Sequence, residues 1–336
     1  MPFTREISNQ FDPVIEHVHQ TYLANHCSGA AVMVIHQDNV VAETYWGHQS
    51  NVEDARTIQE DTQFHVASVR KTYIGFAAAY AVYHGYISSL DDLVTHYISD
   101  LDDDVFKETT IRHLVTHTHG LTDDGLGRDF ESGTSWSYRI IGIELLCRII
   151  YEKTGLTVAQ ILAKEVFEPL GFKETGWYAA PQDNFVEVMR DPNNPHWNTF
   201  DTTDGDKMNM YVSARELAYW GYLHLKQGNA CGRQVVPQGI IELATTLQSP
   251  TFNDKDLPQN GFLWFVKDLP AKRSEIGDLV PKGSYQILGY SNVALLVIPE
   301  YDTVVVRMFN SWGSAPGYEY LPDIKGFGDC VMDCLK

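Results

Sequence analysis

The sequence has strand-like patterns near both ends and helix-like patterns between them. Residues 30–46 contain two β-rich runs separated by Gln37-Asp38-Asn39, which is typical of a hairpin. After residue 260, further runs of strand composition occur at 262–266, 284–288, 293–298 and 303–308. Strands from the two ends can pair only if the chain returns to its starting region. We therefore expect one antiparallel sheet that is assembled from both ends of the chain.

The middle of the chain reads as helical, with polar connections rich in Asp, Gly, Pro and Asn. Apolar residues recur at helical spacing in the segments 11–22, 140–151, 158–166, 217–225 and 324–335. The sequence thus predicts an α+β fold, in which an antiparallel sheet flanked by helices carries a helical insertion domain. A chain of 336 residues is long for one core, so we divide it into a sheet domain of residues 1–66 and 209–336 and a mainly helical domain of residues 67–208.

Charge and cysteine content limit the partners and the compartment. The chain has 25 Lys and Arg against 44 Asp and Glu, a formal net charge of −19 that repels phosphate backbones and anionic lipid. We therefore expect no nucleic acid and no membrane as partners. The five cysteines show no CxxC pattern, and the N-terminal residues lack the basic start and apolar run of a signal peptide. These features predict a cytoplasmic protein, and they leave its oligomeric state open.

A serine and a lysine lie three residues apart at the start of a helix that is apolar on nearly every side. Ser68 and Lys71 begin this segment, which runs to Tyr83 and ends before His84-Gly85. Residues three apart on a helix are neighbours, so the two side chains lie on one face. A lysine in a desolvated site can lose its proton and act as the base for a nucleophilic serine. Since the helix offers almost no polar face, we expect Lys71 to point inward.

The stretch from Asp61 to Thr72 resembles the nucleophile segment of the serine β-lactamase and penicillin-binding superfamily, in its class C β-lactamase-like branch, which includes carboxylesterases and D-aminopeptidases. Four further segments resemble the same branch, at 90–98, 110–121, 212–218 and 297–300. The resemblance covers most of the chain. It implies a β-lactamase/transpeptidase-like fold with the active site between the two domains, and it implies no metal or organic cofactor.

The resemblance also assigns further site residues. Tyr138 matches the tyrosine of the family's Tyr-x-Asn motif, which relays protons together with the lysine, but Ile140 replaces the asparagine. The third motif, Lys-Thr-Gly or His-x-Gly, falls at Ile287-Leu288-Gly289, where only the glycine remains and would let a substrate approach the backbone. The backbone N–H groups of Ser68 and Tyr290 would then form the oxyanion hole. Lys282 could supply the missing cation only through a shifted alignment.

Two other patterns are compatible with metal binding. His113, His117 and His119 have a spacing found among metal ligands, and Asp100, Asp102 and Asp104 resemble the start of a calcium loop. The histidines match ordinary turn positions of the family. The acidic run lacks the glycine and the glutamate that a calcium loop requires. We therefore assign no metal site.

The sequence predicts a serine hydrolase that acts by an acyl-enzyme on a small ester or amide. A β-lactamase, or a D-amino-acid peptidase of the penicillin-binding type, is the nearest alternative. A non-catalytic relative that binds a ligand is the second. Four aromatic residues could line an acyl pocket or pack in the core: Trp136, Tyr285, Tyr290 and Trp312. Loop 190–208, rich in Asp, Asn and Pro, is a hypothetical lid.

Overall fold

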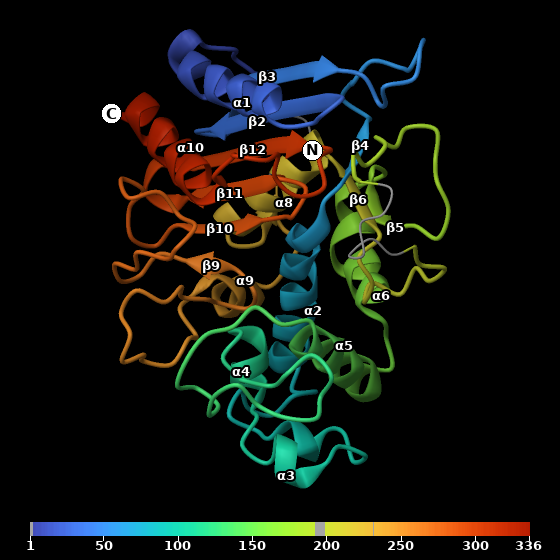
Figure 1. The fold of residues 1–336 in the computed structure, drawn as a ribbon, viewed down its shortest axis with the longest axis vertical. Helices are drawn as coiled ribbons and strands as arrows, with labels where there is room; N and C mark the ends of the chain where they lie inside the picture. Colours follow the sequence, from blue (N-terminus) through green and yellow to red (C-terminus); the bar gives the residue numbers. More distant parts are fainter. Residues whose placement is uncertain (1–2, 192–198, 231) are drawn as a thin grey trace.

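The computed structural model describes residues 3–191, 199–230 and 232–336, and it centres on a seven-stranded sheet (Figure 1). In spatial order the strands are β1 (Thr4–Arg5), β3 (Asn39–Gly47), β2 (Gly29–His36), β12 (Thr303–Phe309), β11 (Ala294–Ile298), β10 (Tyr285–Leu288) and β9 (Phe265–Val266). All neighbouring strands are antiparallel except β1 and β3. Because β2 pairs with β12, the predicted sheet built from both chain ends is confirmed.

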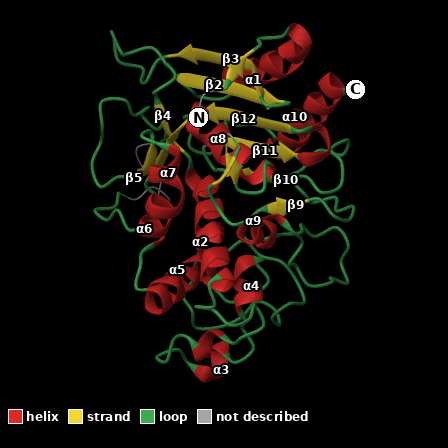
Figure 2. Cartoon of the chain, turned by 180° about the vertical axis from the view of Figure 1, so that it is seen from behind, coloured by secondary structure: helices red, strands yellow, loops and turns green. Residues whose placement is uncertain are grey.

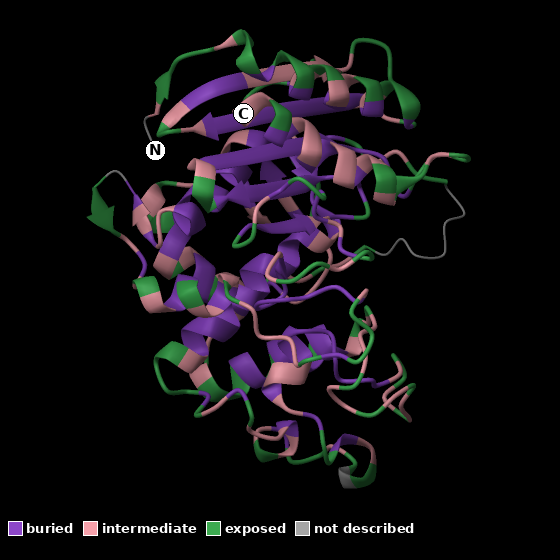
Figure 3. Cartoon of the chain, turned by 90° about the vertical axis from the view of Figure 1, so that its left-hand side faces the viewer, coloured by how far each residue is buried: buried purple, intermediate pink, exposed green. Residues whose placement is uncertain are grey.

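Helices cover both faces of this sheet, which explains why its central strands are apolar throughout. α1 (Asp12–Ala24) and α10 (Tyr320–Leu335) lie together on one face, and α8 (Ala214–Leu225) lies on the other (Figures 1 and 2). Every residue of β11 and β12 is buried between these layers (Figure 3). A strand buried on both faces needs apolar residues at consecutive positions, and the Val-rich runs supply them.

The helical part is arranged around α2 (Lys71–Tyr83), which continues from the short 3₁₀ helix η2 (Ala67–Arg70). α2 packs against α5 (Ile141–Thr154), α6 (Val158–Leu162) and α9 (Gln238–Thr245). With neighbours on every side, nearly the whole of α2 is buried, as its apolar sequence predicts.

Shorter elements complete the chain. A second sheet has the order β4-β6-β5, and β7 pairs with β8. The remaining bounds are η1 (Asn9–Phe11), β4 (Gln63–His65), η3 (Val94–His96), α3 (Asp103–Phe106), α4 (Ile111–Val115), the π-helix η4 (Ala163–Phe167), α7 (Glu168–Leu170), β5 (Thr175–Trp177), β6 (Met210–Ser213), β7 (Asn229–Ala230), β8 (Arg233–Gln234) and η5 (Pro299–Tyr301). Across the described ranges, no helix is both long enough and apolar enough to cross a membrane.

The predicted strand at 262–266 is wrong for its first three residues. Only the last two form β9, because Leu263 has a φ of +63° and turns the chain. The N–H of Phe262 donates to the carbonyl of Ala244, and its own carbonyl lies against Gly75 of α2. A Cβ on Gly75 would be 2.1 Å from that oxygen. The apolar run is thus buried against helices rather than paired in the sheet.

Candidate active site

The segment that carries Ser68 is held by β4 and makes a sharp turn into the helix. β4 pairs with β6, and the N–H of Val66 donates to the carbonyl of Met210 at 3.1 Å. Ala67 then adopts a φ of +46°, a left-handed conformation that costs a non-glycine residue about 1–2 kcal/mol. Such strain persists only where the surrounding structure fixes the backbone, and it concentrates at functional sites. Ser68 is half-buried immediately after this turn.

Lys71 lies beneath Ser68 and also reaches Tyr138. Its side chain is buried, with only 1% of the residue exposed. Its Nζ donates a hydrogen bond to Ser68 Oγ at 3.0 Å and another to the Tyr138 hydroxyl. The structure therefore brings together the three residues that the sequence singles out, although 67 positions separate Lys71 from Tyr138.

Tyr138 is positioned by the loop that precedes α5. The N–H of Ser137 donates to the carbonyl of His117 at 3.0 Å, and the N–H of Ile140 donates to Asp123 Oδ1 at 2.7 Å. The His117 ring packs on the Tyr138 ring with a centroid separation of 4.8 Å. These contacts fix the tyrosine on both sides, so that its hydroxyl faces Lys71.

Burial drives the pKa values of the two groups beside Ser68 in opposite directions. Burial, assisted by the positive charge of Arg70, lowers the pKa of Lys71 well below its usual value. Burial raises the pKa of Tyr138 to about 12, against the lowering effect of a hydrogen bond with Ser68. At neutral pH the phenol is therefore protonated, and Lys71 is the group poised to accept a proton.

Gly289 lies directly beside the nucleophile segment. A Cβ at this position would be 2.4 Å from the carbonyl oxygen of Val66 and 3.4 Å from the Cβ of Ala67. The sequence predicts that this glycine lets a substrate approach the backbone. In the structure, the space that a Cβ would occupy is filled by the backbone of Val66. The glycine is needed because the end of β10 and the start of η2 touch through their backbones.

Tyr290 follows Gly289 and places its backbone near the same point. Its carbonyl accepts a hydrogen bond from the N–H of Gly313 at 2.8 Å, whereas its own N–H has no acceptor among the described residues. The N–H of Ser68 likewise lies in the first turn of a helix, where N–H groups lack an intrahelical partner. Both amides of the predicted oxyanion hole are thus free to bind a ligand oxygen.

The two isoleucine side chains that replace motif residues of the family bring no charge to this site. Ile287 is buried, and Ile140 is exposed at the start of α5. Lys282 does not replace the missing cation, because it is exposed and forms an ion pair with Asp268 at 3.0 Å. The alternative alignment through Lys282 therefore has no structural support.

Arg70 is a functional candidate that the sequence interpretation missed. Only 3% of the residue is exposed, and its Nε and Nη1 have no hydrogen-bond partner within the described part of the chain. Burial lowers the pKa of Arg70. Its position next to Lys71, in a helix without a polar face, is the sequence signal that could have identified it.

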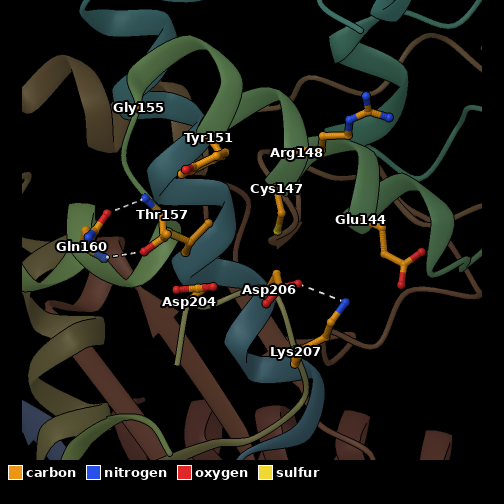
Figure 4. Close-up of a pocket in the computed structure, with 11 residues that line it drawn as sticks. Glu144, Cys147, Arg148, Tyr151, Gly155, Thr157, Gln160, Asp204, Asp206 and Lys207 are labelled. Atoms are coloured by element: carbon orange, nitrogen blue, oxygen red, sulfur yellow. Dashed lines mark hydrogen bonds and ion pairs between the residues drawn. The ribbon is translucent and has the colours of Figure 1, made fainter. Parts of the chain in front are cut away.

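A pocket of about 450 Å³ lies between α5, α6 and residues 204–207 (Figure 4). Glu144, Cys147 and Asp206 line this pocket, and the negative charges of Glu144 and Asp206 oppose the effect of burial on the pKa of Arg70. Neither Ser68, Lys71 nor Tyr138 lines it. The pocket is thus separate from the candidate active site, although Arg70 is electrostatically coupled to both.

Two of the three histidines accept hydrogen bonds from backbone N–H groups. His113 Nδ1 accepts from the N–H of Thr110 at 3.2 Å, and His119 Nδ1 accepts from the N–H of Leu121 at 3.0 Å. The Asp102 carboxylate accepts from the N–H of Asp104. Of the residues that the structure describes, no group of three or more His, Cys, Asp or Glu could hold a metal ion.

The aromatic candidates divide between core and site. Tyr285 is buried and packs on Trp264, so it belongs to the core. Trp136 lies near the Tyr138 ring, and the exposed Tyr290 stacks edge-on against Trp312. Of the hypothetical lid at 190–208, residues 192–198 lie outside the described residues.

Comparison with known proteins agrees with this geometry. Residues 12–325 match the beta-lactamase family. An uncharacterized protein of Alkalihalophilus pseudofirmus is 55% identical over 337 residues, covering 100% of this chain and 99% of its own. A beta-lactamase of Escherichia coli is 26% identical over 74% of this chain and 68% of its own. Esterase EstB of Burkholderia gladioli is 27% identical over 41% of this chain and 44% of its own.

A solved structure shows the same fold over nearly the full length. EstCE1, described as a hydrolase with promiscuous acyltransferase activity, superposes with a TM-score of 0.73 at 19% identity, covering 96% of this chain and 100% of its own. The predicted fold class is therefore confirmed. With the family match across most of the sequence, the chain belongs to the beta-lactamase family, within the serine β-lactamase and penicillin-binding superfamily, and it is a hydrolase of that type.

Proposed function

We propose that this hydrolase cleaves small esters or amides through an acyl-enzyme on Ser68. One observation carries the proposal: the buried Lys71 amine bonds both Ser68 Oγ and the Tyr138 hydroxyl. A serine hydroxyl is a weak nucleophile unless a base lies within hydrogen-bond reach. Lys71 meets that requirement at 3.0 Å, and its lowered pKa favours the uncharged amine that a base must be.

The reaction divides into two steps. Ser68 Oγ attacks the substrate carbonyl while Lys71 accepts its proton, and the amides of Ser68 and Tyr290 bind the oxyanion. The bond to the leaving group then breaks, and the leaving alcohol or amine takes a proton from Lys71 through the protonated Tyr138 hydroxyl. In the second step water attacks the acyl-enzyme, which releases the acid and returns the proton to Ser68.

The altered motifs favour esters and simple amides over β-lactams. Ile287 and Ile140 stand where the family pattern has a cation for a substrate carboxylate and an amide donor for a substrate carbonyl. Neither isoleucine side chain can donate a hydrogen bond. The relative EstB is named an esterase and EstCE1 a hydrolase with acyltransferase activity, which supports the ester assignment. The named beta-lactamase relatives keep penicillins as the substrates to be tested alongside.

Steady-state hydrolysis of p-nitrophenyl butyrate and of benzylpenicillin tests the proposal. We expect ester turnover by the wild type, none above background by Ser68→Ala, and a loss of about 10²–10⁴ in kcat/KM for Lys71→Ala. Lys282→Ala is the matched control, since it removes an exposed lysine that lies outside the site, and it should retain wild-type turnover. Wild-type rates in Lys71→Ala, or turnover of penicillin in preference to the ester, would contradict the assignment.

A further inference from the structure

The hairpin that carries the Tyr290 amide has an asparagine at a position where its backbone favours glycine. The N–H of Gly289 donates to the carbonyl of Val293 at 2.8 Å, so residues 290–292 form the loop between β10 and β11. In hairpin loops of this length the last residue commonly adopts a left-handed conformation, which glycine reaches without steric cost. Asn292 occupies this position with a φ of +60°. Asparagine tolerates the conformation but is not required by it, so its side chain needs another explanation.

The Asn292 side chain is buried and ties the hairpin to the segment that follows β12. Only 4% of the residue is exposed. Its Nδ2 donates to Ser311 Oγ at 3.1 Å and to the carbonyl of Gly313 at 3.2 Å. The segment that accepts these bonds is itself held in place, since the N–H of Trp312 donates to the carbonyl of Met189 at 2.8 Å. The loop is therefore anchored to a fixed part of the structure.

The backbone of Asn292 acts on the amide that is expected to bind the oxyanion. Its N–H donates to the carbonyl of Gly289 at 2.8 Å. This carbonyl and the N–H of Tyr290 belong to the same peptide group, whose atoms lie in one plane. A hydrogen bond that fixes the carbonyl therefore also fixes the direction of the N–H. The next peptide group is held as well, because the carbonyl of Tyr290 accepts from the N–H of Gly313 at 2.8 Å.

The orientation of this peptide group matters because it lies beside the nucleophile segment. A Cβ at Gly289 would be 3.4 Å from the Cβ of Ala67, the residue that precedes Ser68. An oxyanion hole stabilises the transition state only when its donors lie about 2.7–3.1 Å from the developing oxyanion. A small rotation of the peptide group would therefore weaken the bond from the Tyr290 amide.

We infer that Asn292 is a positioning residue of the oxyanion hole, which orients the Tyr290 amide by anchoring the hairpin to Ser311 and Gly313. This inference rests on the proposed function and on the role of the Tyr290 amide within it. It adds a residue whose side chain bonds only to the protein and acts through the backbone of its neighbours.

A pair of substrates separates the alignment of the oxyanion hole from a general loss of activity. p-Nitrophenyl butyrate places an oxygen in the hole, whereas O-(4-nitrophenyl) thionobutyrate places a sulfur there, which accepts hydrogen bonds more weakly. The ratio of the two kcat/KM values reports the oxyanion bonds, while a loss of folded protein lowers both values equally. We expect the wild-type ratio of ester to thionoester to exceed the ratio of their alkaline hydrolysis rates by about 10-fold or more.

Variants then test Asn292 itself. Asn292→Gly keeps a left-handed backbone accessible and removes both side-chain bonds. We expect kcat for p-nitrophenyl butyrate to fall by about 10-fold with little change in KM, and the ester-to-thionoester ratio to fall toward that of alkaline hydrolysis. Ser311→Ala removes one of the two acceptors and should shift the ratio in the same direction by less.

The matched control is Asp54→Gly. Asp54 is exposed and also has a left-handed backbone, with a φ of +62°, in the loop that precedes β4. This substitution makes the same kind of backbone change outside the site, so it should keep the wild-type ratio.

A wild-type ratio in Asn292→Gly, when thermal unfolding shows that the variant is folded, overturns the inference. If Asn292→Gly does not fold, Ser311→Ala decides, and an unchanged ratio there overturns the inference in the same way. A wild-type enzyme whose ratio equals that of alkaline hydrolysis also overturns it, although Ser68-dependent ester turnover would still support the proposed function. If Ser68-dependent turnover is absent, the proposed function itself fails, and the role of Asn292 falls with it.

Discussion

At the residue scale, the chemistry depends on two buried cations that are adjacent in sequence. Lys71 and Arg70 are both nearly inaccessible, and neither has a carboxylate hydrogen-bonded to it among the described residues. Each positive charge disfavours another nearby, and Lys71 has the lower intrinsic pKa of the two. The lysine is therefore the group that gives up its proton. Arg70 is in this sense a positioning residue, which sets the charge state of Lys71 without touching substrate.

Replacing Arg70 tests this electrostatic role. In Arg70→Gln the pKa of Lys71 should rise, so the acid limb of the kcat/KM profile for a neutral ester should shift to higher pH. Activity at pH 7 should fall and should recover in more alkaline solution. Arg70→Lys keeps a positive charge and should leave the limb closer to its wild-type position. An unshifted limb in Arg70→Gln would show that burial alone sets the protonation of Lys71.

The sequence could identify Ser68, Lys71 and Tyr138 but not the groups that tune them. The first two are close in the chain, and the third follows from a motif. His117 acts on Tyr138 through the packing of separate segments, which no local spacing encodes, whereas Arg70 is adjacent to Lys71 in sequence and only its burial depends on the fold. The roles of all these residues stay predictions until the variants are measured.

At the element scale, the site depends on the contact between the end of β10 and the start of η2. In Gly289→Ala the new Cβ would collide with the carbonyl of Val66, so β10 and the nucleophile segment must move apart. Because the Tyr290 amide moves with β10, we expect kcat to fall by about 10² or more.

The control for this prediction is Gly127→Ala. A Cβ at Gly127 meets nothing closer than the Thr122 hydroxyl at 3.8 Å, so this substitution introduces no collision. Hydrolysis of p-nitrophenyl butyrate and thermal unfolding of both variants provide the measurement. Wild-type kcat in Gly289→Ala would mean that this contact does not position the oxyanion hole.

Strands were predictable from apolar runs where the whole run is buried between two helical layers. They were not predictable where an apolar run is buried in another way. The apolar runs of β11 and β12 lie between helices on both faces, so their composition indicates a strand correctly. The run at 262–264 is equally apolar but turns at Leu263 to pack on α2. Composition alone does not distinguish these two forms of burial.

At the scale of the whole molecule, a buried ion pair links the central sheet to the helices that cover one of its faces. Arg307 of β12 is fully buried and donates to Asp323 Oδ2 of α10 at 2.5 Å, and Thr21 of α1 donates to the other oxygen at 2.7 Å. The positive charge of Arg307 holds the pKa of Asp323 well below its usual value, despite the opposing effect of burial. One carboxylate thus links both covering helices to a central strand.

Removing this carboxylate should destabilise the fold strongly. Asp323→Asn leaves Arg307 buried without a counter-charge, which we expect to lower the free energy of unfolding by about 3–5 kcal/mol. Urea unfolding at pH 7 measures this, with Asp91→Asn as the control, because its ion pair with Arg112 is largely exposed and contributes less. Equal losses in the two variants would contradict the structural role of Asp323.

The same ion pair predicts the acid dependence of stability. Because the pKa of Asp323 is lowered in the folded state, its contribution is fully present above its unfolded pKa of about 4 and is lost as the pH falls through the folded value. The stability difference between the wild type and Asp323→Asn should therefore shrink in acid. A difference that stays constant from pH 7 to pH 3 would contradict the lowered pKa.

The pairing of strands from the two ends of the chain in one sheet was predictable because strand patterns flank the helical middle. The division into residues 67–208 and the two flanking segments stays a prediction. The pairing of Asp323 with Arg307 could not be predicted, since many acidic and basic residues are available and only the folded topology brings these two together.

The most direct test of the central claim is the intact mass of the protein after reaction with a fluorophosphonate, followed by peptide mapping. The account predicts one adduct per chain, located on Ser68, absent from Ser68→Ala and formed much more slowly by Lys71→Ala. An adduct on another residue, or no adduct across the pH range in which the protein is folded, would contradict it.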